Sequence, residues 1–305
     1  MTELRCLTIG IEVIRINSMI KVLLKGGLGN QMFQYALGRA LSISNKTNLV
    51  LDTSYLDLEI KKITKRNYDL DVFGIEINNI NSNTPFIFKT FKNKILTNLF
   101  LMIRKVFRVK GQEMSYNFNP EILNVGSDAY LSGYFQSYKY FDKYKDQIIK
   151  DFTFKNIPNN IEVLAGEISN TNSVCIHLRR GDYVGNKNHE VVNLDYYKKG
   201  IDIISQKTKI EKIYVFSDDI AWCRSNLKFD FDTIFVGEEY VGYKDSGHMY
   251  LMSKCRNFII ANSSFSWWAA WLAPRSDKMV ICPKKWFGDS SINTNDLIPE
   301  TWIRI

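Results

Sequence analysis

The feature that most restricts the fold of this chain is a regular alternation of short apolar runs and amphipathic stretches in its second half. The alternation starts after residues 156–160, where Asn and Pro cluster as they do in loops. Predicted strands at 174–178, 212–216, 233–236, 258–261 and 279–282 alternate with predicted helices at 194–205, 220–227, 249–255 and 265–272. This order predicts a parallel sheet covered by helices on both faces.

The first half of the chain begins in the same way. A strand at 20–25, a glycine loop, a helix at 31–44 and a second strand at 49–52 form the start of a βαβ fold. A further strand at 129–133 leads into a predicted aromatic-rich helix at 134–149. We therefore expect two domains, residues 19–157 and 158–305, whose combined length suits ordinary domain sizes.

Residues 1–18 are expected to be a peripheral extension, because Met19 starts a new strand. An ordered extra strand from Cys6 to Ile16 remains the alternative. The opening residues do not have the pattern of a signal peptide, and no apolar run reaches the roughly 18–20 residues that span a bilayer. A cytoplasmic protein without a transmembrane helix is expected.

The spacing of cysteine and histidine and the net charge restrict the kinds of site and partner that this chain can have. The five cysteines and three histidines lack disulfide or metal spacing, so reduced core cysteines and no metal site are expected. A net charge of +8 favours an anionic partner but does not choose among nucleotide, nucleic acid and lipid. No RNP, zinc or helix-turn-helix signature is present, and we expect no nucleic-acid partner.

Residues 89–110 carry basic side chains and no acid, interleaved with apolar residues at helical spacing. One interpretation is a helix that docks peripherally on an anionic membrane surface. The other is a helix that packs its apolar face against its own domain. Both stay open at the level of sequence.

The strand at 174–178 ends in a dense group of chemically active side chains: His177, Arg179, Arg180, Asp182 and Tyr183. Ligands of open α/β sheets bind where strands end, and paired guanidinium groups suit a phosphate or a carboxylate. The alternative is an internal Arg–Asp ion pair that only closes the strand end.

The glycine loop joins a strand to a helix through Gly26, Gly27 and Gly29, followed by Asn30 and Gln31. A helix N-terminus there could meet an anion through backbone amides, and the missing side chains allow close approach. The spacing is neither a Walker loop nor a dinucleotide fingerprint. A purely structural turn is the alternative.

Two more strand ends carry polar residues. Ser217, Asp218 and Asp219 suit hydrogen bonds from a nucleobase or a ribose, or else they cap the next helix. The other strand end leads into a helix with three tryptophans, which we interpret as core residues. Its candidate binding residues are Asn262, Ser263, Ser264, Phe265 and Ser266. Together these features predict a nucleotide diphosphate in a cleft, with Arg179 in the role that a metal plays elsewhere.

Five segments carry a resemblance to a known family: GGLGNQMFQYA at 26–36, GYFQS at 133–137, HLRRGDY at 177–183, SDD at 217–219 and IIANSSFSWWAAW at 259–271. Over residues 19–290 the chain resembles the bacterial α-1,2-fucosyltransferases of glycosyltransferase family 11. The resemblance implies an α/β fold of GT-B type, with two Rossmann-like domains that face each other across a cleft. It also implies inverting transfer of L-fucose from GDP-fucose to the 2-hydroxyl of a galactoside, without a cofactor or metal.

Site roles follow from the same resemblance. Arg179 contacts the diphosphate, supported by His177, Arg180 and Asp182. Residues 217–219 match the guanosine region, and residues 262–266 match the phosphate and fucose side. Asn30 is expected to position an acceptor hydroxyl or a phosphate, and no residue is named as general base.

The expected setting is O-antigen or capsule synthesis, with a galactoside acceptor that is lipid-linked at the cytoplasmic face of the inner membrane. A fucosyltransferase of a different, α-1,6-like linkage, or a non-catalytic module that binds a GDP-sugar, is the alternative.

Overall fold

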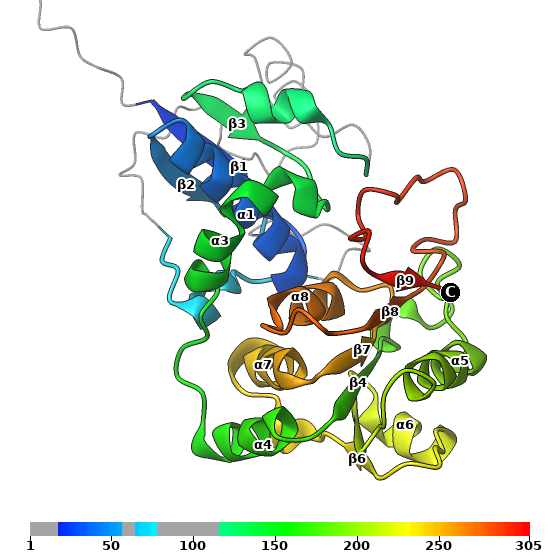
Figure 1. The fold of residues 1–305 in the computed structure, drawn as a ribbon. Helices are drawn as coiled ribbons and strands as arrows, with labels where there is room; N and C mark the ends of the chain where they lie inside the picture. The colour runs from blue at the N-terminus through cyan, green and yellow to red at the C-terminus, as the bar shows by residue number, and fades with distance from the viewer. Residues whose placement is uncertain (1–17, 57–64, 78–115) are drawn as a thin grey trace, which may run out of the picture.

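The computed structural model describes residues 18–56, 65–77 and 116–305, which form two parallel β-sheets with helices around them (Figure 1). The first sheet has the strand order β2-β1-β3, with β1 at Met19–Leu23, β2 at Asn48–Asp52 and β3 at Ala129–Leu131. The second sheet has the order β6-β5-β4-β7-β8-β9. Its strands are β4 (Ser173–Leu178), β5 (Lys212–Ser217), β6 (Thr233–Phe235), β7 (Asn257–Ile259), β8 (Val280–Cys282) and β9 (Ile303–Arg304).

All strand pairs in both sheets are parallel, so the carboxyl ends of β4, β5 and β7 lie at one edge of the second sheet. Helices α5 (Leu194–Ser205) and α6 (Ile220–Asn226) pack on one face of this sheet. Helices α4 (Asn159–Ser169), α7 (Ser246–Lys254) and α8 (Ser264–Leu272) pack on the other face (Figure 1). The predicted alternation is confirmed to within a few residues at each boundary, and β9 was not predicted.

The first half differs from the prediction in two places. Helix α1 spans Leu28–Ser44 and begins three residues before the predicted run, so Gly29 and Asn30 lie in its first turn. The predicted single helix at 134–149 is wrong, because the chain there forms two 3₁₀ turns and the short helix α3 (Lys145–Asp151). Phe135 has a left-handed backbone (φ 52°), which no helix continues through. Ser137 then caps the turn that follows it.

Within the described residues the 3₁₀ turns are η1 (Leu70–Phe73), η3 (Pro120–Asn124), η4 (Tyr138–Tyr140), η5 (Asp142–Tyr144), η6 (Gly181–Tyr183), η7 (Glu238–Tyr240) and η8 (Tyr243–Asp245).

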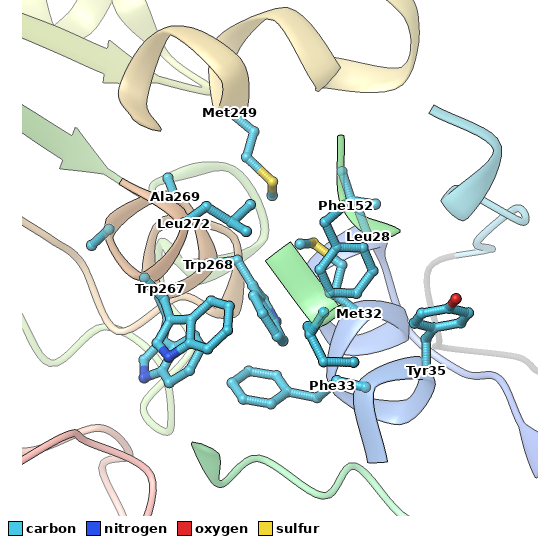
Figure 2. Packing of buried hydrophobic residues seen from close by; sticks show 14 of the residues in the cluster. Leu28, Met32, Phe33, Tyr35, Phe152, Met249, Trp267, Trp268, Ala269 and Leu272 are labelled. Carbon is cyan, nitrogen blue, oxygen red and sulfur yellow. The ribbon is translucent and has the colours of Figure 1, made fainter. Parts of the chain in front are cut away.

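A single hydrophobic cluster joins the two sheets, since α1 packs directly on α8. The ring of Phe33 lies 4.6 Å from that of Trp267 and 4.9 Å from that of Trp268, centroid to centroid (Figure 2). The indole nitrogen of Trp268 donates to the carbonyl of Gly29 at 2.9 Å. The interpretation of the helix tryptophans as core residues is confirmed, because Trp267, Trp268 and Trp271 are all buried.

Three further expectations from the sequence concern the cysteines, membrane-spanning helices, and the segments at 1–18 and 89–110. The four cysteines within the described ranges are buried and free, as expected. In the same ranges no helix is long and apolar enough to cross a membrane. The basic stretch at 89–110 and nearly all of the expected extension at 1–18 lie outside the described residues.

Candidate functional site

A pocket of about 880 Å³ lies where the two halves of the chain meet. Its walls come from the start of α1, the segment 65–69, the end of β4 and the start of α8. The predicted site residues that line it are Gly26, Gly27, Gly29, Asn30, Arg179, Asp182, Tyr183, Asn262, Ser263, Ser264 and Phe265. The structure thus brings the glycine loop, the β4 exit and the β7 exit together around one space.

The N-termini of α1 and α8 touch in this pocket. A Cβ placed on Gly29 would lie 2.6 Å from the carbonyl carbon of Ser264 and 2.7 Å from the amide nitrogen of Phe265. Only glycine allows the two helices this approach. Helix N-termini carry amides without intrahelical acceptors and a partial positive charge, so both ends favour an anion in the space beside them.

Arg179 supplies a full positive charge beside these helix ends. Its guanidinium pairs with Asp182 (Nη2 to Oδ1, 2.8 Å) and with Asp218 (Nη1 to Oδ2, 3.1 Å). Burial alone would lower the pKa of Arg179, but these two carboxylates outweigh it and raise the pKa. The side chain is 27% exposed, so it is held by ion pairs and still lines the pocket. The ion-pair interpretation and the ligand interpretation are therefore compatible.

Arg180 lies apart from the pocket. Its Nε pairs with Asp219 Oδ2 at 3.2 Å, and its guanidinium lies 3.5 Å from the ring centroid of Trp222. It lines a second cavity, of about 770 Å³, beside α5 and α6, whereas Arg179 lines both cavities. Arg180 thus extends away from the α1 and α8 termini.

The predicted guanosine residues 217–219 organise these arginines and line neither cavity. Asp218 Oδ1 accepts from the backbone N–H of Arg180 at 2.8 Å. Asp219 accepts from the backbone N–H of Trp222 at 3.1 Å, as the N-cap of α6. The helix-cap alternative is confirmed for Asp219.

His177 is 5% exposed and is absent from the pocket lining. Burial, followed by the charges of Arg179 and His248, lowers its pKa to about 3. The imidazole is therefore neutral at physiological pH and is a weak proton acceptor.

Gln31 and Ser266 are fully buried and support the pocket from behind. Gln31 Nε2 donates to the carbonyls of Gly26 (2.9 Å) and Asn67 (2.7 Å), and its Oε1 accepts from the N–H of Asp69 (2.9 Å). This amide ties the glycine loop to the 67–69 segment. The Ser266 hydroxyl donates to the carbonyl of Ser263 at 3.2 Å, within the first turn of α8.

With this geometry in view, comparison with known proteins identifies the family. The sequence profile described as glycosyl transferase family 11 matches residues 11–305. The chain belongs to glycosyl transferase family 11. The match begins eight residues before Met19, inside the expected extension.

Three curated proteins of known name are similar to this family 11 protein in sequence. An α-1,2-colitosyltransferase of Escherichia coli is 33% identical, with 94% of this chain and 99% of that protein covered. The O-antigen biosynthesis glycosyltransferase WbnK, also of Escherichia coli, is 34% identical, with 92% and 99% covered. A galactoside 2-α-L-fucosyltransferase of Caenorhabditis elegans is 23% identical, with 100% and 84% covered.

Some pocket residues of this family 11 glycosyltransferase were missed by the sequence analysis. They are Arg66, Asp69, Tyr116, Tyr134, Gln136, Lys244 and Phe287. Two of them, Tyr134 and Gln136, lie in the GYFQS segment at 133–137, one of the five segments that carry the family resemblance. Gln136 Nε2 donates to Asn30 Oδ1 at 2.7 Å, which joins this segment to the start of α1.

Proposed function

We propose that this protein transfers L-fucose from GDP-fucose to the 2-hydroxyl of a terminal galactoside, with inversion, in the synthesis of a cell-surface glycan such as an O-antigen or capsule. One observation carries the proposal: the N-termini of α1 and α8 meet at Gly29 and Ser264, in a pocket that Arg179 also lines. Two helix ends and a guanidinium fit a diphosphate better than they fit an uncharged ligand.

In the proposed reaction the galactose 2-oxygen forms a bond to fucose C1 while the bond from C1 to the diphosphate oxygen breaks. The electron pair of the broken bond leaves with GDP, and the 2-hydroxyl proton passes to a base. Arg179 stabilises the charge that develops on the diphosphate, in place of a metal. Asp182 is held between Arg179 and Arg66 (3.3 Å), so its role is to orient these guanidinium groups.

The two substrates are assigned to different parts of the chain. Residues 158–305 supply Arg179, Ser263 and Ser264 on the donor side, and residues 19–157 contribute Asn30 to the acceptor side. Asn30, held by Gln136, is the proposed contact for an acceptor hydroxyl or a phosphate. A lipid-linked acceptor at the cytoplasmic membrane face is part of the proposal and accounts for a basic segment at 89–110.

Transfer of colitose is the second candidate, favoured by the identity of 33% to an α-1,2-colitosyltransferase over nearly the whole chain. Colitose is fucose without its 3-hydroxyl, so the two donors share the diphosphate and the guanosine. A site that hydrogen-bonds the 3-hydroxyl would reject the deoxy sugar, whereas a site built for colitose would leave that hydroxyl without a partner.

The test is a transfer assay with lactose and either GDP-fucose or GDP-colitose, with and without EDTA. We expect release of GDP and a product with fucose on the galactose 2-oxygen, unchanged by EDTA. Faster transfer from GDP-colitose would replace the proposed donor. Tight GDP binding without transfer to any galactoside would reject the enzyme and leave a binding module.

A further inference from the structure

Five rings form a continuous row along one side of the 880 Å³ pocket, and we call this row the aromatic wall. Its members, in spatial order, are Tyr134, Tyr116, Phe287, His189 and Tyr183, and all five line the pocket. Successive ring centroids are 6.5, 4.8, 5.8 and 4.8 Å apart. The rings are half-buried rather than buried, and the wall lies at the edge of the hydrophobic core, against which Phe287 packs.

A basic side chain lies against the ring at each end of the wall. At one end the guanidinium of Arg179 lies 5.7 Å from the ring centroid of Tyr183. At the other end the ammonium of Lys25 lies 4.3 Å from the ring centroid of Tyr134. A molecule that reacts next to Arg179 lies beside the Tyr183 end of this row, in the pocket that all five rings line.

Buried hydrogen bonds hold the C-terminal part of the wall in place. Asn262, 3% exposed, donates from Nδ2 to the carbonyls of His189 (3.0 Å) and Trp286 (2.9 Å). The backbone carbonyl of Asn262 accepts from the Tyr183 hydroxyl at 3.1 Å. One buried amide therefore connects the segments that carry three of the five rings, and the wall is formed before any ligand binds.

The wall is also uncharged. Burial lowers the pKa of His189 despite the opposing charge of Asp182, so its imidazole is neutral near pH 7. Beyond the wall, Gln136 lines the pocket at 7% exposure, and its Oε1 has no hydrogen-bond partner among the described residues. A buried acceptor without a partner costs free energy, and a hydroxyl bound against this side chain would supply the donor.

We propose that the aromatic wall binds the acceptor as an oligosaccharide of at least two sugar rings. This inference rests on the proposed function. A galactopyranoside carries C–H groups on one face, which suit the face of an aromatic ring, and its hydroxyl rim suits amides such as those of Asn30 and Gln136. The wall has five rings along one pocket, so the sugar next to the terminal galactose also has an aromatic ring to contact.

The experiment compares binding of methyl β-galactoside, lactose and GDP to the wild-type protein and to wall variants, each measured by calorimetry. For the wild type we expect lactose to bind about tenfold more tightly than the monosaccharide. Tyr116→Leu and Phe287→Leu should lose that gain, because leucine keeps apolar volume without a flat face. Tyr116→Phe is the matched control and should keep it, and GDP affinity should change less than about twofold in all variants.

Equal loss in Tyr116→Phe and Tyr116→Leu, or no gain from the second sugar in the wild type, would overturn the inference. A selective loss of GDP affinity would instead make the wall a nucleobase platform. If a leucine variant does not fold, saturation-transfer NMR on the wild type decides, since irradiation of aromatic protons should reach the galactose C–H protons. Oligosaccharide binding to the wall without fucosyl transfer would reject the proposed function alone.

Discussion

Arg179 is the single side chain on which the proposed chemistry depends most. Its guanidinium contacts Asp182 and Asp218 with different nitrogens, and one ammonium cannot reproduce this fork. We expect Arg179→Lys to lower kcat/KM by about 10²-fold, the scale for one oriented charge stabiliser. Arg180→Lys is the comparison, because Arg180 is absent from the pocket lining and should cost less. Steady-state kinetics with GDP-fucose and lactose measures both, and a larger loss at position 180 would contradict the assignment.

Asp69 makes stability depend on pH. Burial is the main reason that its pKa rises to about 6; Asp71 and Asp245 add to the rise, while Lys244 and Arg66 oppose it. A carboxyl whose folded pKa is raised stabilises the fold below its unfolded pKa, near 3.8, and loses this contribution as pH rises through about 6.

Asp69→Asn removes that titration. The variant should therefore be more stable than the wild type at pH 7.5, by about 1–2 kcal/mol, with the advantage gone at pH 4. Denaturant unfolding at the two pH values measures this, and Asp128→Asn on an exposed turn serves as control. An equal gain at both pH values would show that the charge of Asp69 is not the cause.

Local sequence patterns placed the candidate site residues at the ends of strands. They did not predict which of these side chains face the pocket. Arg179 and Arg180 are adjacent at a strand exit, and sequence alone treats them alike. The structure separates them, because Arg180 contacts Asp219 and Trp222 and does not line the pocket that Arg179 lines. Those partners lie about 40 residues away in the chain, and no local rule pairs them.

At the scale of elements, the contact between α1 and α8 depends on one missing methyl group. Gly29→Ala would put a Cβ within 2.6–2.7 Å of the α8 backbone, which cannot move like a flexible side chain. We expect a loss of about 1–3 kcal/mol in the free energy of unfolding and weaker GDP binding.

Gly166→Ala in α4 is the matched control for this prediction. A Cβ there meets nothing within 4 Å, so the change should stabilise the helix by up to about 1 kcal/mol. Thermal unfolding and GDP titration distinguish the two sites. Tolerance of alanine at position 29 would show that the helix ends do not need this close approach.

Element types were predictable where a hydrophobic period ran long enough, as in α5, whose predicted range was 194–205. The segment 134–149 was not, because its aromatic residues suggested a helix while backbone geometry interrupted it. Phe135 adopts a left-handed conformation that apolar spacing does not encode. Its ring is fully buried, so tertiary packing overrides local preference there.

At the scale of the molecule, the two sheets share one hydrophobic cluster, a property that the two-domain expectation did not contain. The alternation of strands and helices predicted each sheet separately. It did not predict that α1 from the first half packs on α8 from the second, because this contact joins residues more than 200 positions apart. The pocket lies beside this junction, so the packing of the two halves also sets the geometry of the site.

The shared cluster predicts that both halves unfold together. Trp268 contacts Phe33, Phe141 and Phe152 with ring centroids 4.9–5.3 Å away, and it donates to the Gly29 carbonyl. Trp268→Phe removes this donor and leaves a cavity, which should cost about 2–3 kcal/mol. Far-UV circular dichroism and tryptophan fluorescence should report one coincident transition in the wild type and in the variant.

Trp222→Phe is the control for this prediction, because Trp222 is only partly buried and packs against the other hydrophobic cluster. Trp222→Phe should lower the free energy of unfolding by less than Trp268→Phe does, since a partly exposed ring leaves no closed cavity behind. If the two probes gave separate midpoints, the sheets would be independent domains, and the contact between α1 and α8 would be a docking surface. If the circular dichroism and fluorescence midpoints coincide and are both lower in Trp268→Phe than in the wild type, the contact between α1 and α8 stabilises the whole fold.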